Sequence, residues 1–249
     1  MTLKGRFGCK TDIGLVRPSN EDKAISLIDP YGNVLLCVCD GMGGYMKGDF
    51  ASKIASDILS TSFINKRRWL FSFQVTSWVN KMIKTINNSV FTEASEDEHF
   101  TGMGTTLCMA VFFRKKIYLA NVGDSRAYAL EKDEIRQLTR DQTLVEYEVS
   151  YKKITKDEKL TSKDRHVIMN FIGKNKKINF EYKVIENEGK TILLCSDGLY
   201  NNAQDKQIFS ALDSQDRLDQ KIGTLIGIAK ANGGTDNIAV SIWEPYKDD

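Results

Sequence analysis

An uninterrupted apolar run ends in an acidic turn dipeptide at Val34-Leu35-Leu36-Cys37-Val38-Cys39-Asp40-Gly41. Six apolar residues bounded by turn residues predict a buried β-strand, because the run is short for a helix. The same arrangement returns at Leu193-Leu194-Cys195-Ser196-Asp197-Gly198. The chain therefore places a carboxylate at the end of a buried strand at least twice.

Further segments with strand or helix patterns lie on either side of these two apolar runs. Short runs rich in Val, Ile, Leu and Cys, or alternating apolar residues, predict strands at 23–29, 33–39, 105–113, 116–122, 191–196 and 237–243. Apolar residues at helical spacing predict helices within 51–59, 75–90 and 218–229. Close strand pairs joined by Tyr31-Gly32 and by Arg114-Lys115 predict hairpins and antiparallel sheets. This pattern favours an α+β fold in which helices pack on an antiparallel sandwich.

Length and composition limit the class of protein. A chain of 249 residues with only 3 prolines predicts a single domain over 1–249. Hydrophobic residues at 41% and charged residues at 27% exclude collagen-like, mucin-like and wholly disordered chains. The 35 basic and 33 acidic residues leave a formal charge of +2, which gives no reason to expect a nucleic-acid partner.

Targeting signals and cysteines indicate an intracellular setting. The apolar runs are far shorter than the roughly 18 residues that a membrane span needs, and the N-terminus lacks the apolar stretch of a secretory signal. We therefore expect a cytoplasmic protein with no membrane partner. The 5 cysteines form no Cys-x-x-Cys pair, so we expect reduced thiols and no zinc site.

Four aspartates stand at predicted strand ends. Asp40 and Asp197 follow buried strands, Asp124 follows the strand at 116–122, and Asp236 precedes the final strand. Each alone is most simply a turn residue. If the sheets bring these carboxylates together, however, only a divalent cation would let them remain ionised side by side. An all-oxygen ligand set favours Mg²⁺ or Mn²⁺.

The stretch 11–22 adds Glu21, Asp22 and a preceding Arg17. An arginine near a metal cluster suits an intervening anion, because its planar fork matches two phosphate oxygens. The alternative is a surface arginine paired with Glu21, which contributes about 0 to 1 kcal/mol. The glycines at 41–44 and 102–106 lack the spacing of nucleotide-binding loops, and they allow close backbone approach instead, leaving the Gly41 carbonyl available to a metal.

Seven motifs in order carry a family resemblance. They are T-D-x-G-x-x-R-x-x-N-E-D at 11–22, D-G-M-G-G at 40–44, G-M-G-T-T at 102–106, N-V-G-D-S-R-A-Y at 121–128, L-T-R-D-Q-T at 138–143, L-C-S-D-G-L at 194–199 and G-G-T-D-N at 233–237. With them the chain resembles the metal-dependent protein phosphatases, the PPM family of type 2C serine/threonine phosphatases, in their compact bacterial form. The resemblance implies a four-layer α-β-β-α sandwich and hydrolysis of phosphoserine and phosphothreonine in proteins.

The resemblance also implies ligands for two catalytic Mn²⁺ or Mg²⁺ ions. Asp40 would bridge both ions, and Asp197 and Asp236 would complete one of them. The Gly41 carbonyl and Glu21 would serve the other, partly through water. A water or hydroxide bridging the ions would attack phosphorus directly, with no covalent phosphoenzyme.

Other implied roles surround this pair of ions. Asp22 would hold waters around the ions, Asp124 with Asp197 would form a weaker third metal site, and Arg17 would bind the substrate phosphate. The general acid stays open, because Met42, Tyr45 and Gln142 stand where relatives carry histidines. Neither His99 nor His166 shows metal-ligand spacing, and we expect both in solvent-exposed segments.

Residues 152–183 differ in composition, with ten Lys/Arg against four Asp/Glu, a local balance of +6. Such a run is most simply a solvated face. By resemblance it falls within a flap subdomain at about 145–185 beside the active site, where its charge would attract phosphoproteins.

Partners and alternatives follow from the same resemblance. We expect phosphoproteins as substrates, a cognate serine/threonine kinase as a partner, and a monomer. A catalytically silent binding module and a hydrolase of small phosphate esters are the alternative functions.

Overall fold

The computed structural model describes residues 4–43 and 47–246, apart from the side chains of Glu98, Lys156 and Leu160. Tyr45, at one of the positions where a histidine is replaced, lies outside the described residues, as does Gly44 of the D-G-M-G-G motif.

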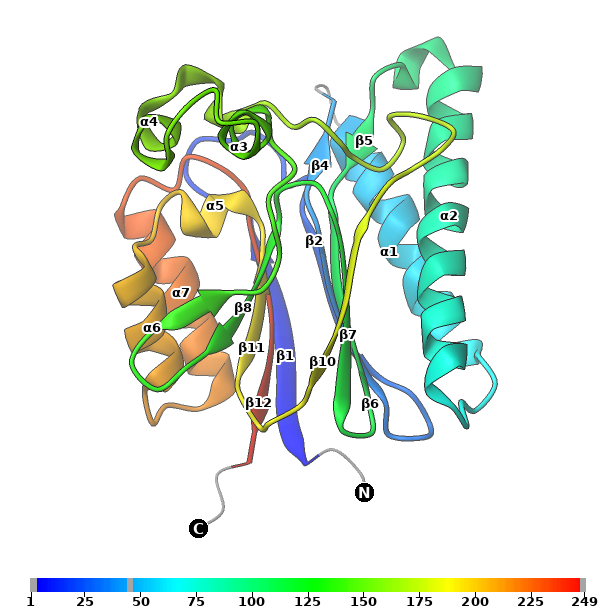
Figure 1. Cartoon of the computed structure of the whole chain (residues 1–249), viewed down its shortest axis with the longest axis vertical. Coiled ribbons are helices and arrows are strands. Elements are labelled where there is room, and N and C mark those ends of the chain that lie inside the picture. The colour runs from blue at the N-terminus through cyan, green and yellow to red at the C-terminus, as the bar shows by residue number, and fades with distance from the viewer. Residues whose placement is uncertain (1–3, 44–46, 247–249) are drawn as a thin grey trace.

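Two five-stranded antiparallel sheets lie face to face between two layers of helices (Figure 1). The strands of the first sheet, in spatial order, are β1 (Gly5–Asp12), β12 (Ile238–Pro245), β11 (Ile192–Cys195), β8 (Arg126–Leu130) and β9 (Ile135–Gln137). Those of the second are β10 (Glu181–Glu186), β7 (Lys116–Val122), β6 (Leu107–Phe113), β3 (Val34–Cys39) and β2 (Lys23–Ile28). The expected α+β four-layer sandwich is confirmed.

Each sheet is covered on its outer face by helices. The second sheet is covered by α1 (Lys47–Asn65) and α2 (Ser72–Glu96), and the first by α5 (Asp197–Tyr200), α6 (Asp205–Asp213) and α7 (Leu218–Ala231). The shorter elements are β4 (Gly41–Met42), β5 (Gly104–Thr105), α3 (Leu144–Ser150), α4 (Lys156–Thr161) and the 3₁₀ turns η1 (Glu98–Phe100) and η2 (Lys163–His166).

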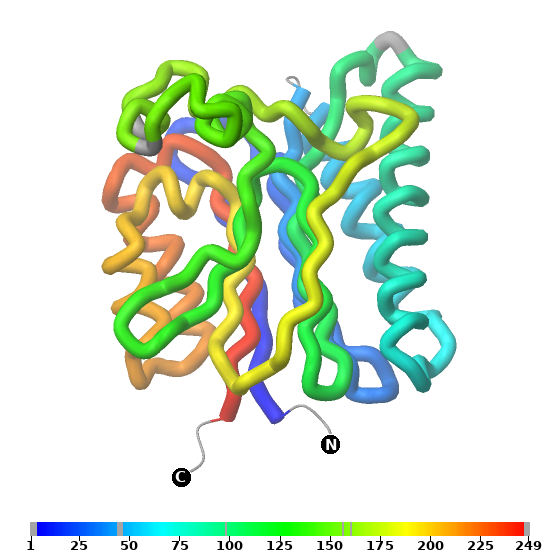
Figure 2. Tube along the Cα trace, viewed as in Figure 1, coloured from blue at the N-terminus to red at the C-terminus, as the bar shows by residue number. Residues whose placement is uncertain are grey.

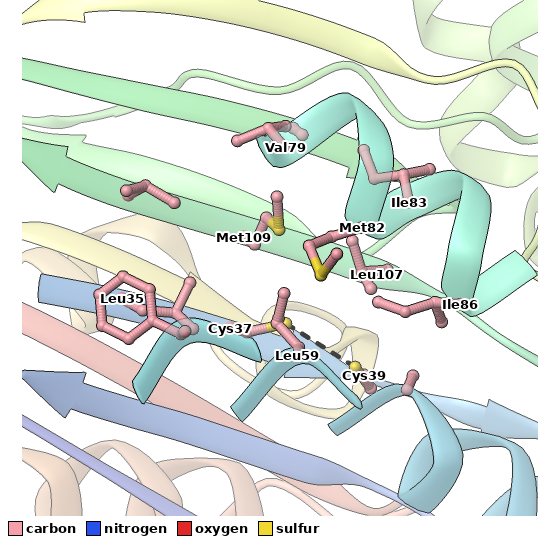
Figure 3. Packing of buried hydrophobic residues seen from close by; sticks show 14 of the residues in the cluster. Leu35, Cys37, Cys39, Leu59, Val79, Met82, Ile83, Ile86, Leu107 and Met109 are labelled. Carbon is pink, nitrogen blue, oxygen red and sulfur yellow. Dashed lines mark hydrogen bonds between the residues drawn. The ribbon is translucent and has the colours of Figure 1, made fainter. Parts of the chain in front are cut away.

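Strand β3 is apolar throughout because both of its faces are buried. Leu35 and Cys37 face α1 and α2 together with Met109 of β6, as Figure 3 shows. Val34 and Leu36 face the opposite sheet, within the core between the two sheets. A strand covered on both faces has no position that favours a polar residue, so the two-residue period disappears from its sequence.

The helices form where the sequence repeats apolar residues at three and four positions. In α2 this row is buried against the second sheet and includes Val79, Met82, Ile83 and Ile86 (Figure 3). The predicted helices at 51–59, 75–90 and 218–229 lie inside α1, α2 and α7. No helix in the described part of the chain is long and apolar enough to span a membrane.

Both expected hairpins are present. Strands β2 and β3 are joined through a turn in which Gly32 has φ 82°, and β6 and β7 through Arg114, with φ 54°. Several elements have no counterpart among the predictions: β1, β8, β9, β10 and α6. Strand β1 has a mostly polar sequence and lies at a sheet edge, where the apolar pattern is weakest.

The segment that follows β9 runs across one end of the sandwich. It contains α3, α4 and η2, and then descends into β10 (Figures 1 and 2). It includes most of the region expected to form a flap, and it lies over the end of the sandwich at which β3 and β7 finish.

Candidate active site

The aspartates from the strand ends meet at one end of the sandwich. Asp40 lies between β3 and β4, Asp124 follows β7, Asp197 begins α5 shortly after β11, and Asp236 precedes β12. Asp22 comes directly before β2. Neighbouring strands run antiparallel, so some strands end and others begin at the same end of each sheet. Because the two sheets lie face to face, these ends lie close together.

A cleft of about 1050 Å³ opens at this end. Its lining includes Arg17, Glu21, Asp40, Gly41, Asp197 and Asp236. Asp22 and Asp124 are 2% and 4% exposed and are absent from the lining, so they are buried in the protein near the cleft. The structure thus brings all eight sequence-derived site residues to one region, six on the cleft wall and two buried.

Burial and mutual repulsion disfavour ionisation of these carboxyl groups. Burial is the main cause that raises the pKa of Asp22 to about 8 and the pKa of Asp124 to about 7, with neighbouring Asp197 adding to both. Burial, together with Asp236, raises the pKa of Asp197 to about 6. The pKa of Asp40 is raised well above its ordinary value by burial and by the four other aspartates. A hydrogen bond with Asp40 partly offsets the rise in the pKa of Asp197.

Asp124 has a buried oxygen without a partner. Its Oδ1 makes no hydrogen bond within the described structure, whereas its backbone carbonyl accepts a hydrogen bond from the Tyr200 hydroxyl at 3.1 Å. A buried polar atom left unpaired costs about 1–3 kcal/mol. This unpaired carboxylate oxygen indicates that a cation could bind Asp124 and compensate its buried charge.

Arg17 forms an ion pair with Asp236. Its Nη2 donates to Asp236 Oδ2 at 2.8 Å, and the two side chains are 54% and 31% exposed. This pair differs from the surface pair with Glu21 considered from the sequence. The guanidinium therefore lies at the cleft and neutralises one carboxylate of the cluster.

Close backbone packing holds Glu21 beside Gly41 and Gly48. A Cβ atom on Gly48 would lie 2.1 Å from Glu21 Oε2, and a Cβ atom on Gly41 would lie 2.2 Å from the Gly48 carbonyl oxygen. Only glycine fits at either position without a shift of backbone or carboxylate. The expectation that the glycines at 41–44 and 102–106 allow close approach is confirmed at Gly41 and Gly104 but is wrong at Gly102, where a Cβ atom would meet nothing within 4 Å.

Neutral side chains in the same motifs position the acidic ones. Asn237 Oδ1 accepts a hydrogen bond from the Glu21 backbone N–H at 2.8 Å, and Thr106 Oγ1 accepts one from the Asp40 N–H at 2.9 Å. Ser196 Oγ donates to Asp22 Oδ2 at 2.7 Å. No role was expected for these three residues, although all of them stand within the quoted motifs or next to a strand-end aspartate.

The residues at the expected histidine positions have different surroundings. Met42 lines the cleft. Gln142 instead braces the loop before Asp124, because its Oε1 accepts from the Gly123 N–H at 3.0 Å. His166 lines the cleft together with Arg165, whose Nε donates to His166 Nε2 at 2.8 Å. Both histidines are solvent-exposed, as expected.

The donor chemistry fits hard divalent cations. Among residues 4–43 and 47–246, no three His, Cys, Asp or Glu side chains already have the spacing of a metal site. The ingredients are nevertheless those that Mg²⁺ and Mn²⁺ prefer: carboxylate oxygens, a nearby backbone carbonyl and an orphaned Asp124 oxygen. The free thiols lie mainly in the core, and four of the five are buried.

Comparisons with known proteins agree with this geometry. The chain is 33% identical over 236 residues to the serine/threonine phosphatase stp of Listeria innocua, covering 94% of both chains. Its structure matches that of the serine/threonine phosphatase Stp1 from Staphylococcus aureus with a TM-score of 0.91, 31% identity and coverage of 100% of this chain and 98% of that one. It also matches the catalytic domain of the serine threonine protein phosphatase PstP, solved in complex with 2 manganese ions, with a TM-score of 0.84, 29% identity and coverage of 98% and 99%. The family model for protein phosphatase 2C matches residues 18–232, and the chain therefore belongs to the protein phosphatase 2C family.

Proposed function

We propose that the chain hydrolyses phosphoserine and phosphothreonine in proteins at the cleft lined by Arg17 and Asp40. In class it is a metal-dependent protein serine/threonine phosphatase of bacterial type. The observation that carries the assignment of the site is the convergence of buried strand-end aspartates beside a cleft that also holds an arginine.

The proposed ligands for Mn²⁺ or Mg²⁺ follow from the cluster. Asp40 would contribute to both ions, Asp197 and Asp236 would hold one, and Glu21 and the Gly41 carbonyl would hold the other. Bound there, the ions supply an activated water and neutralise charge on the phosphoryl oxygens. Burial raises the pKa of Asp40, so its carboxyl group must lose its proton before it acts as a ligand.

The two buried aspartates have supporting roles in this proposal. Asp22, held by Ser196, accepts hydrogen bonds from waters around the ions. Asp124 supplies its orphaned oxygen, with Asp197, to a weaker third site.

Arg17 binds and orients the phosphate group. Its guanidinium now donates to Asp236, and its planar fork can donate to two phosphate oxygens when that carboxylate has another partner. Fixing the phosphate in this way aligns phosphorus with an attacking water and lowers the entropic cost of the reaction.

The segment 145–185 acts as a substrate-attracting flap. Arg165, His166 and Ile168 line the cleft opposite the carboxylates, and ten of the residues between 152 and 183 are basic. Their excess positive charge draws in phosphorylated, acidic segments of substrate proteins and offsets the negative field of the cluster. Together with the sandwich, the flap makes one catalytic domain.

The cellular setting extends the proposal. The five cysteines are free thiols, which suits a reducing cytoplasm. The chain acts as a monomer that opposes a serine/threonine kinase.

The test is phosphate release from a phosphothreonine peptide, with Mn²⁺ and with chelator, for wild type and Asp236→Asn. We expect activity only with metal, and a loss of at least about 10²-fold in Asp236→Asn, comparable to removing one electrostatic contact to a transition state. Asp213→Asn, at an exposed position on α6, is the matched control and keeps full activity.

Two other results would change the conclusion. Folded wild type that releases no phosphate with Mn²⁺ or Mg²⁺ supports the silent binding module. Faster turnover of metabolite phosphates than of phosphopeptides supports a small-ester hydrolase.

A further inference from the structure

Three connections meet at the end of the molecule opposite the cleft: the β2–β3 turn, the α1–α2 connection and the β6–β7 turn (Figures 1 and 2). They form one continuous surface. Arg114 Nη2 of the β6–β7 turn donates to the Leu70 carbonyl at 2.8 Å, and the Arg68 guanidinium lies 6.0 Å from the centroid of the Tyr31 ring. We call this surface the basic–aromatic end; it comprises Tyr31, Arg67, Arg68, Leu70, Phe71, Phe73, Arg114 and Lys115.

Large apolar side chains project from this surface into water. Leu70, Phe71 and Phe73 are 51%, 57% and 68% exposed. Of the phenylalanines that the structure describes, only these two are exposed. Their rings stack on each other with centroids 5.8 Å apart. Single exposed apolar residues are ordinary, but a contiguous exposed group indicates a binding surface.

The backbone holds these side chains outward. Gln74 Oε1 accepts hydrogen bonds from the N–H groups of Leu70 at 2.6 Å and Phe71 at 2.9 Å, while Arg114 binds the Leu70 carbonyl. The connection is therefore fixed at three points, and exposure of the rings is a property of an ordered turn.

Positive charge surrounds the exposed rings. Arg67, Arg68, Arg114 and Lys115 have no carboxylate partner within the part of the chain that the structure describes. The adjacent lysines differ, because Lys66 pairs with Asp29 and Lys116 with Glu186. Four unneutralised basic residues thus border the apolar group.

We propose that the basic–aromatic end docks reversibly on a membrane surface rich in anionic lipid headgroups. Aromatic side chains favour the interface between headgroups and acyl chains, and nearby Lys and Arg are attracted to anionic lipids. Side chains that project from turns can insert into a deformable lipid surface, whereas a folded protein partner would need pockets of complementary shape. The expectation of no membrane partner rested on the absence of spanning runs, and docking of this kind needs none.

Docking in this orientation leaves the cleft free. The cleft and the basic–aromatic end lie at opposite ends of the sandwich, so the bound protein presents its carboxylate cluster away from the lipid surface (Figure 1). The inference goes beyond the proposed activity, and its test requires no catalysis.

The experiment is cosedimentation of the full chain with vesicles of phosphatidylcholine alone and with vesicles of equal parts phosphatidylcholine and phosphatidylglycerol. We expect binding to the anionic vesicles at low salt and release at high salt. Phe71→Ser/Phe73→Ser lowers the partition coefficient by about tenfold or more through lost apolar burial. Arg67→Gln/Arg68→Gln lowers it by about fivefold for each arginine removed.

A second exposed aromatic pair provides the control. Tyr147 and Tyr151 are 48% and 62% exposed, and their ring centroids are 4.4 Å apart on the helix α3 side of the molecule. Tyr147→Ser/Tyr151→Ser keeps wild-type partition, and unchanged melting of Phe71→Ser/Phe73→Ser shows that it folds.

Three results overturn the proposal: no binding to anionic vesicles at low salt, equal binding by Phe71→Ser/Phe73→Ser, or a dimer in sedimentation velocity that this variant abolishes without any vesicle binding. The last result identifies the surface as an interface between copies of the chain.

Discussion

Strand β2 has a buried aspartate at each end, and their surroundings are opposite. Asp29 follows the strand and accepts hydrogen bonds from Lys66 and from the side chain and backbone of Asn33. Although burial opposes ionisation, these partners lower the pKa of Asp29. Asp22 precedes the strand, and its pKa is raised to about 8 by burial despite the hydrogen bond from Ser196.

The difference separates a carboxylate of the fold from carboxylates of the site. At the Asp29 end the buried carboxylate has its partners inside the chain, and the result is a closed turn. At the Asp22 end several carboxyl groups are buried together, and the Arg17 ion pair compensates them only in part. A buried charge that the chain leaves uncompensated is a reason to expect a ligand from outside.

The largest expected effect comes from removing the cationic partner of Asp29. Lys66→Met leaves Asp29 as an unpaired buried charge and lowers the free energy of unfolding by about 3 kcal/mol, which corresponds to a Tm lower by about 6–12 °C. Thermal melting checks this. Phosphopeptide turnover well below the Tm stays at the wild-type rate, because Lys66 is far from the cleft.

A double variant distinguishes lost charge pairing from lost packing. Lys66→Met/Asp29→Asn regains more than half of the lost stability if the unpaired charge is the cause. A Lys66→Met variant that melts like wild type would contradict the claim that Lys66 compensates the buried charge of Asp29.

The pH dependence of the free energy of unfolding tests the Asp22 end of β2, where several carboxyl groups are buried together. Asp22, Asp124 and Asp197 have folded-state pKa values of about 8, 7 and 6, all above the ordinary value. The folded protein therefore binds more protons than the unfolded chain, and the free energy of unfolding falls as pH rises from about 4 to 8. Melting curves in chelator across this range measure the slope.

Metal should remove this slope. With Mn²⁺ present the carboxylates bind as anions, so stabilisation by metal grows as pH rises. Identical melting with Mn²⁺ and with chelator at pH 8 would count against a cation site.

Neutralising one buried carboxylate should act in opposite directions with and without metal. In chelator, Asp124→Asn raises the free energy of unfolding by about 1 kcal/mol, which corresponds to a Tm higher by about 2–4 °C. The reason is that a neutral amide replaces a buried carboxyl group whose ionisation is disfavoured. With Mn²⁺ the variant gains less stabilisation than wild type. Asp213→Asn, which is exposed, changes neither value; a destabilised Asp124→Asn in chelator would show that the carboxylate supports the fold.

The smallest effect concerns the basic segment above the cleft. Reversing the exposed Lys174, Lys176 and Lys177 to glutamate lowers kcat/KM for an acidic phosphopeptide by about threefold and flattens its salt dependence. The matched control reverses three exposed lysines elsewhere, Lys81, Lys84 and Lys132. Equal effects of the two triple variants would assign the attraction to net charge rather than to the segment.

The core of the fold could be predicted from the sequence because its strands and helices carry strong patterns. Strands β3 and β6 are buried on both faces and appear as continuous apolar runs. Strand β1 contains Arg6, Lys10 and Asp12. It is fixed mainly by pairing with β12, more than two hundred positions later, which no local pattern reveals.

The site could be predicted in part for a related reason. Aspartates at strand ends are visible in the sequence, but their convergence depends on how two sheets pack, and their assignment to particular ions came from family resemblance. The pairing of Arg17 with Asp236 joins residues 219 positions apart and had no sequence signal. The roles of Ser196 and Asn237 were missed because neutral residues in turn motifs look like turn residues.

The ion pair between Arg17 and Asp236 has a consequence for the order and strength of binding. In the proposed function, a phosphate that accepts from Nη2 of Arg17 would displace Oδ2 of Asp236, and a cation that binds this oxygen would displace Arg17. Whichever ligand arrives first would already have broken the pair, so the second would bind without that cost. By thermodynamic linkage each ligand would then strengthen the other by the same factor, and one contact of 2.8 Å would make cation and substrate binding cooperative.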